Sequence, residues 1–189
     1  MNKIWLSSDW HFCHDREFIY KSRGFNNIEE MNEAIVKNHN MIVSSDDDVY
    51  VLGDLMLGND EEAKRYIERL KGRIHVVRGN HCTDKRWNEI YPTISNVVEF
   101  CDWAKIIHYR KCHFYLSHFP TLTSNLEKES LHQCIINLHG HTHATKKFFE
   151  DRPYMYNVAL DAHNCYPVLL DMIIDEIKEE IQKCKELIE

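Results

Sequence analysis

The sequence contains no apolar run that approaches the ~18 residues needed to cross a membrane. Its first residues, MNKIWLSSDWHF, also lack an apolar signal segment followed by a cleavage site. They favour a β-strand that begins almost at once. We therefore expect no membrane partner and a cytoplasmic protein.

Paired cysteine motifs are absent as well. The chain has seven cysteines, an odd number at scattered spacings, and none of them form a C-x-x-C pair. This pattern argues against a disulfide framework and against a structural zinc knuckle. We expect most of these cysteines to act as small buried apolar residues.

The chain carries no excess of positive charge, since its net charge is -7 at pH 7. A tight binder of extended nucleic acid normally presents a basic face. Four basic pairs occur, but they are scattered: Lys64-Arg65, Lys85-Arg86, Arg110-Lys111 and Lys146-Lys147. The charge balance therefore favours a small or locally recognised substrate over extended nucleic acid.

The composition is that of an ordinary globular protein, with 43% hydrophobic and 28% charged residues over 189 positions. No linker, internal repeat or low-complexity tract interrupts it. These features predict a single domain over residues 1–189.

The hydrophobic pattern changes character along the chain. Strand-like and helical segments alternate in the first part, where Asn27 and Glu30 resemble a capping box at a helix start. The expected strands are 3–7, 48–52 and 74–78, and the expected helices are 28–43, 60–70 and 85–90. The second part is mostly strand-like, over 96–100, 103–109, 113–117, 135–139 and 154–160. This organisation predicts an α/β (α+β) fold of two sheets packed face to face, with helices outside.

The last expected element is an amphipathic helix over residues 168–188. Apolar residues recur along one stripe of it, at Leu170, Ile173, Ile174, Ile177, Ile181, Cys184 and Ile188. Such a stripe predicts packing on a sheet, and a dimer contact is the alternative. The oligomeric state is left open.

Carboxylate, imidazole and amide side chains gather where the predicted strands end. They lie in five short segments: Asp9-Trp10-His11, Gly53-Asp54, Gly79-Asn80-His81, Ser117-His118 and Gly140-His141-Thr142-His143. Each segment alone is common, and a lone histidine is more often a hydrogen-bonded core residue than a ligand. Together they offer the ligand mixture that divalent transition metals prefer. The glycines permit sharp turns that aim the following side chains into a cleft.

The order D-x-H, G-D, G-N-H, H, G-H-x-H resembles that of the calcineurin-like metallophosphoesterase superfamily. Other stretches look like its small bacterial and phage members, namely SDWHFCHDREFI, VYVLGDL, LSHFP and NVALDAHNCYPVLLD. The resemblance implies a four-layer α-β-β-α sandwich of two mixed sheets flanked by helices. It also implies hydrolysis of a small phosphomono- or phosphodiester by a hydroxide shared between two metal ions.

The same resemblance implies a set of ligands. One metal ion would be bound by Asp9, His11 and His143, and a second by Asn80, His118 and His141. Asp54 would bridge the two ions. Their identity stays open among divalent or trivalent Mn, Fe, Zn, Ni and Co.

Three further residues are candidates for contact with the substrate. The resemblance implies that His81 contacts the phosphate or protonates the leaving group. His14 and Arg23 follow motifs closely enough to reach the cleft, and arginine suits a bidentate grip on phosphate. Each of these two either touches substrate or serves the structure.

Departures from the family pattern narrow the expected activity. Cys82 stands where relatives often carry an acidic residue after G-N-H. Leu55 to Gly58 replace the G-D-x-x-D-R-G extension of serine/threonine protein phosphatases, which argues against that role. Two alternatives to a phosphoesterase of small substrates remain: a non-catalytic metal-binding scaffold on the same fold, and a nuclease acting on short nucleic acid.

Overall fold

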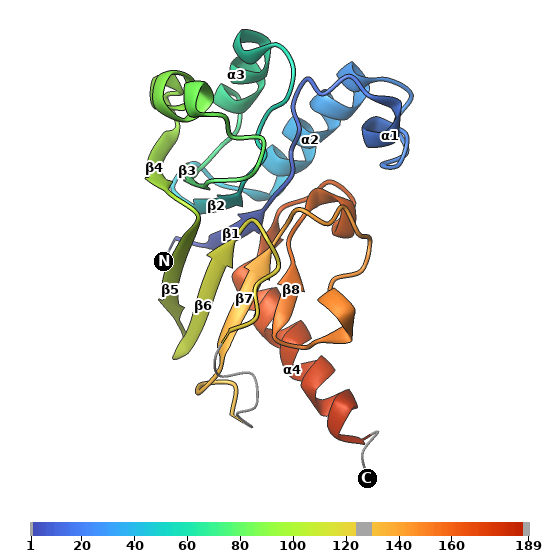
Figure 1. The fold of residues 1–189 in the computed structure, drawn as a ribbon, viewed down its shortest axis with the longest axis vertical. Coiled ribbons are helices and arrows are strands. Elements are labelled where there is room, and N and C mark those ends of the chain that lie inside the picture. The colour runs from blue at the N-terminus through green and yellow to red at the C-terminus, as the bar shows by residue number, and fades with distance from the viewer. Residues whose placement is uncertain (1, 124–129, 187–189) are drawn as a thin grey trace.

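Two mixed β-sheets form the centre of the structure, a computed structural model that describes residues 2–123 and 130–186 (Figure 1). The first sheet has five strands in the order β4-β3-β2-β1-β9, and only β9 runs antiparallel to its neighbour. Its strands are β1 (Ile4–Ser7), β2 (Asp48–Leu52), β3 (Arg73–Val77), β4 (Val97–Cys101) and β9 (Val168–Leu169).

The second sheet has four strands in the order β5-β6-β7-β8. β5 pairs antiparallel with β6, whereas β6, β7 and β8 are parallel. Its strands are β5 (Ala104–Tyr109), β6 (Cys112–Ser117), β7 (Ile135–His139) and β8 (Met155–Asn157). The predicted α/β fold with two mixed sheets and helices is confirmed.

Helices of the first part of the chain cover one face of the first sheet (Figure 1). These helices are α2 (Ile28–Ile42) and α3 (Asp60–Glu68), and the short α1 (Glu17–Tyr20) lies beyond α2, away from the strands. α2 begins where predicted, because the Asn27 side chain accepts a hydrogen bond from the Glu30 backbone N–H at 2.8 Å. Such a cap contributes about 1 kcal/mol. The buried faces of α2 and α3 share one apolar cluster with Val49 of β2 and Ile74 of β3.

The long C-terminal helix α4 (Leu170–Glu186) packs on the sheets of its own chain. Its apolar stripe joins Leu6 of the first sheet and Phe114 of the second in a single buried cluster. Members of that stripe in the cluster are Leu170, Ile173, Ile174 and Ile177, with Ile181 partly buried. The prediction of packing on a sheet is thus confirmed over these residues. Ile188 lies outside the described residues.

Some boundaries differ from the prediction. Val168 and Leu169, expected at the start of the helix, form β9 instead, because their backbones pair with Leu6 and Trp5 of β1. The strand expected over 154–160 ends at Asn157, and a short 3₁₀ turn, Leu160–Ala162, follows it. The short helix expected over 85–90 is a π-helical turn, Arg86–Ile90. α1 has only four residues and was not predicted.

The structure also describes the state of the cysteines and the apolarity of the helices. The cysteines of the described residues form no disulfide, and Cys82, Cys112, Cys134 and Cys165 are buried. Within residues 2–123 and 130–186, none of the helices combines the length and apolarity that a bilayer crossing requires.

Candidate functional site

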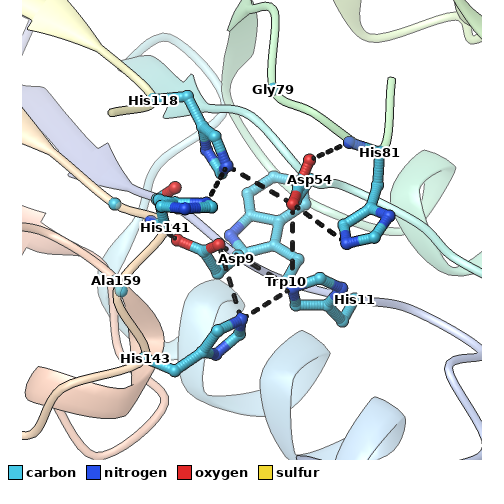
Figure 2. Close-up of polar contacts among 12 residues, drawn as sticks. Asp9, Trp10, His11, Asp54, Gly79, His81, His118, His141, His143 and Ala159 are labelled. Carbon is cyan, nitrogen blue, oxygen red and sulfur yellow. Dashed lines mark hydrogen bonds and ion pairs between the residues drawn. The ribbon is translucent and has the colours of Figure 1, made fainter. Parts of the chain in front are cut away.

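The seven predicted metal ligands converge at the ends of the strands that precede them, and Figure 2 shows all of them except Asn80. The carboxyl ends of parallel neighbours meet at one edge of a sheet, so the loops after β1, β2 and β3 lie together. The loops after β6 and β7 reach the same place from the second sheet. The residues brought together are Asp9, His11, Asp54, Asn80, His118, His141 and His143.

Asp9, His11 and His143 form one group. Asp9 Oδ1 lies 3.7 Å from His11 Nε2 and 3.8 Å from His143 Nε2, and the two nitrogens are 3.2 Å apart. Asp9 is fully buried, yet its Oδ1 has no hydrogen-bond partner. An unpaired buried carboxylate oxygen costs free energy unless a cation balances it. The donor set of this group therefore fits a divalent metal ion.

Asn80, His118 and His141 form a second group around Asp54. His118 Nε2 lies 2.7 Å from Asn80 Oδ1, and His141 Nδ1 lies 3.0 Å from the same oxygen. Asp54 Oδ2 is 3.4 Å from His118 Nε2. Ligand atoms of Asp9, Asp54 and His118 all lie within 4.8 Å of one another, so the two groups adjoin.

Asp54 faces both groups. Its side chain is 2% exposed, and its Oδ2 lies 4.0 Å from His11 Nε2 on one side and 3.4 Å from His118 Nε2 on the other. Its other oxygen, Oδ1, accepts a hydrogen bond from the His81 backbone N–H at 2.9 Å. The Asp54 Oδ2 atom therefore lies between histidines of the two groups.

Protonation of the site favours cation binding. Burial raises the pKa of the Asp9 carboxyl, but the imidazoles of His11 and His118 outweigh it and hold that pKa well below its ordinary value. Burial lowers the pKa of His11 and of His141. Burial acts in the same direction at His143, but the carboxylates of Asp161 and Asp9 outweigh it and raise that pKa. Carboxylates that stay ionised and imidazoles that stay neutral are the forms that bind metals.

The backbone at the site is strained. Five of the predicted ligands adopt the left-handed conformation, with positive φ angles that non-glycine residues seldom take: Asp9, His11, Asp54, His141 and His143. Each such residue costs about 1–2 kcal/mol. Gly140 permits a close approach instead, because a side chain there would collide with Ser8 Oγ and with Asp9 Oδ2.

His81 and His14 line a pocket beside the two groups. The pocket has a volume of about 360 Å³, and Phe18, Ile19 and Leu57 form its apolar wall. His81 is 42% exposed, and its Nε2 lies 4.0 Å from Asp54 Oδ2. The His14 ring lies 5.3 Å from that of His11, and burial lowers the His14 pKa to about 4. Both side chains therefore lie where a bound molecule could contact them.

Arg23 lies beside the site but is enclosed by protein. Its guanidinium donates hydrogen bonds to both carboxylate oxygens of Asp161, and its side chain is 2% exposed. These contacts favour the structural alternative that the sequence had left open. Asp161 itself also accepts a hydrogen bond from His143 Nδ1 at 3.1 Å. Asp161 was not predicted to have a role, and its one signal in the sequence is its place in the family-like stretch NVALDAH.

Cys82 belongs to the packing beneath the site. It is 3% exposed, and its sulfur accepts hydrogen bonds from the Gly79 backbone N–H at 3.3 Å and from the Tyr91 hydroxyl at 3.5 Å. Burial raises the pKa of this thiol. The residue that departs from the family pattern is thus part of the packed protein interior.

Known proteins resemble this chain in sequence and in fold. An uncharacterized protein of Methanocaldococcus jannaschii is 34% identical over 185 residues, which cover 95% of this chain and 93% of that protein. The gene 66 protein of Mycobacterium phage L5 is 24% identical over 76% of this chain and 79% of its own. A protein of unknown function from Aquifex aeolicus has a similar fold, with a TM-score of 0.69 and 24% identity, covering 93% of this chain and 99% of that one.

The model of one protein family matches most of the sequence. That family is described as calcineurin-like phosphoesterase, and the match extends over residues 2–174. It includes both sheets and every group of side chains described above. The match shows that this chain, whose clusters of histidine and aspartate are consistent with a dinuclear metal site, belongs to the calcineurin-like phosphoesterase family.

Proposed function

We propose that this protein hydrolyses a small phosphate ester, a phosphomonoester or a phosphodiester, with two divalent or trivalent metal ions bound between its sheets. The observation that carries the proposal is the position of Asp54, whose Oδ2 faces His11 on one side and His118 on the other. A carboxylate in that place can be shared by two ions about 3.5–4 Å apart, the spacing typical of two-metal hydrolases.

In the proposed site, Asp9, His11 and His143 would hold one ion, and Asn80, His118 and His141 the other. When bound, the ions would lower the pKa of water and offset the charge on the phosphoryl oxygens. The tautomer of His118 is fixed by the protein, because its Nδ1 donates to the Leu52 carbonyl at 2.7 Å. Its Nε2 is therefore left with a lone pair that faces the site.

His81 is the proposed proton donor. Its backbone is held by Asp54 Oδ1, while its imidazole lines the pocket. A substrate phosphate beside Asp54 would place the leaving-group oxygen within reach of that imidazole. Transfer of its proton to the leaving oxygen would contribute about 10²–10⁴-fold. His14 lines the same pocket and is a second candidate for substrate contact.

The test is a screen of metal ions against phosphate esters. Metal-free protein would be loaded with Mn, Ni, Co, Fe, Zn or Mg and assayed on p-nitrophenyl phosphate, its bis-ester, cyclic nucleotides and a short oligonucleotide. We expect turnover of small esters with at least one transition metal. Binding of two ions without turnover of any of these substrates would support the scaffold alternative, and turnover of the oligonucleotide alone would support the nuclease.

The Asp54→Asn variant tests the bridge directly. A neutral amide shares two cations poorly, so the variant should lose tight binding of both ions and nearly all turnover. Metal analysis that still found two tightly bound ions, together with near-normal turnover, would refute the assignment of Asp54.

A further inference from the structure

Asp161 and Arg23 form a buried ion pair beside the candidate metal site. Arg23 donates from Nε to Asp161 Oδ1 at 3.1 Å and from Nη2 to Oδ2 at 2.8 Å. Exposure of the two side chains is 2% for Arg23 and 7% for Asp161. A bidentate pair of this kind fixes the plane of the carboxylate as well as its position.

The carboxylate fixed in this way contacts His143. Asp161 Oδ2 accepts a hydrogen bond from His143 Nδ1 at 3.1 Å. In the neutral form of His143, this hydrogen bond places the proton on Nδ1 and leaves the lone pair on Nε2. His143 Nε2 is the atom that lies 3.2 Å from His11 Nε2 and 3.8 Å from Asp9 Oδ1.

Arg23 also holds the loop that carries Asp9. Its Nη2 donates to the Asp9 carbonyl at 2.7 Å, and its Nη1 donates to the Trp10 carbonyl at 3.3 Å. One guanidinium thus connects the loop after β1 to Asp161, and Asp161 connects to the loop after β7. These loops bring two ligands of one group, Asp9 and His143, from different sheets.

We propose that Asp161, clamped by Arg23, is a positioning residue that orients His143 and preforms the Asp9–His11–His143 site for a metal ion. The inference rests on the proposed function, since it concerns one of the two proposed metal sites. Carboxylates that orient a metal-binding histidine through its other nitrogen typically contribute about 10–100-fold in metal affinity. The second group is built differently, because the backbone carbonyl of Leu52 orients His118 there. Loss of Asp161 should therefore weaken one metal site and leave the other unchanged.

The experiment is a calorimetric titration of metal-free protein with Zn²⁺. Wild-type protein should bind two equivalents, and Asp161→Ala should bind one of them about 10–100-fold more weakly. Arg23→Lys is the milder variant, because a lysine can reach Asp161 but cannot hold both carboxylate oxygens and the two carbonyls. It should weaken the same equivalent by a smaller factor, and it decides the question if Asp161→Ala does not fold.

Glu176→Gln is the matched control. Glu176 is a half-buried carboxylate in the same part of the chain, and it accepts hydrogen bonds from Lys147 Nζ at 2.7 Å and from the Tyr156 hydroxyl at 2.6 Å. It does not contact any of the proposed ligands described here. This variant should keep both zinc affinities. A loss of zinc affinity seen only on substitution of Asp161 would then not be a general effect of removing a carboxylate charge.

A second readout follows the imidazole itself. In zinc-loaded protein labelled with ¹⁵N at histidine, the wild-type His143 spectrum should show a protonated Nδ1 and a metal-bound Nε2. Asp161→Ala should lose the slowly exchanging Nδ1 proton. Equal weakening of both zinc equivalents, or of neither, in a wild-type background of two bound ions would overturn this inference alone. A wild-type protein that binds no zinc or other transition metal would instead overturn the proposed function, and the inference with it.

Discussion

A methyl group added at Gly53 should damage both the fold and the candidate metal site. A Cβ atom there would lie 2.7 Å from the Gly79 Cα and 2.7 Å from His118 Nδ1. These contacts are shorter than real Cβ atoms tolerate, so the backbone at Gly79 or the imidazole of His118 must shift. Displacement of His118 would also break its hydrogen bond to the Leu52 carbonyl.

The cost of Gly53→Ala can be worked out from two contributions. Gly53 has a φ of +89°, and a left-handed backbone costs an alanine about 1–2 kcal/mol. Forcing a methyl group into a closely packed position adds about 1–3 kcal/mol. The expected total, about 2–5 kcal/mol, is a large part of the 5–15 kcal/mol that stabilises a typical domain.

Gly24 provides the matched control, because its φ is +85° but nothing lies within 4 Å of its missing Cβ. Gly24→Ala should therefore lose only the conformational contribution of about 1–2 kcal/mol. The measurements are urea unfolding of the metal-free proteins and zinc titration. Equal destabilisation by the two substitutions, or wild-type zinc affinity in Gly53→Ala, would refute the argument that the Gly53–Gly79 contact positions His118.

Three further predictions concern histidines. His81→Ala should keep both metal ions and lose more rate on an alkyl phosphate ester than on p-nitrophenyl phosphate, because nitrophenolate leaves without a proton; equal losses would indicate phosphate binding instead. His143 has a φ of 49°, so metal-free His143→Gly should unfold at a higher urea concentration than His143→Ala, the reverse of the usual order. Burial lowers the pKa of His39 from 6.5 to about 4, so the unfolded chain binds a proton that the folded protein does not as pH falls through that window. The free energy of unfolding should therefore decrease as the pH falls from 6.5 to 4. Urea titrations of His39→Gln should show about 3 kcal/mol less of this decrease than the wild type. An unchanged pH dependence in the variant would contradict the prediction.

The strands and the places where polar side chains follow them could be predicted from the sequence, because both depend on short-range patterns. The runs Asp48–Leu52 and Ile135–His139 are apolar, bounded by turns, and form strands as expected. The Asn27 cap is local too, since its partner is three residues away. That a single domain spans residues 1–189 stays a prediction.

Other features depend on contacts between distant parts of the chain. Arg23 and Asp161 are 138 positions apart, and no pattern in the sequence relates them. β9 has only two residues, and the apolar stripe of the helix that follows made them look like the start of that helix. They form a strand because they pair with β1. The left-handed backbone conformation of five predicted ligands could not be predicted either, because aspartate and histidine do not indicate that conformation as glycine does.

The pairing of β1 with β9 also has a consequence for the newborn chain. Trp5 and Leu6 are synthesised well before their partners Leu169 and Val168, because those lie more than 160 positions later in the sequence. Until β9 has been made, that side of β1 has backbone N–H and C=O groups without a partner strand, the kind of edge on which unfinished chains aggregate. A chain truncated before Val168 would therefore lack β9 and would leave β1 as an open edge of the first sheet.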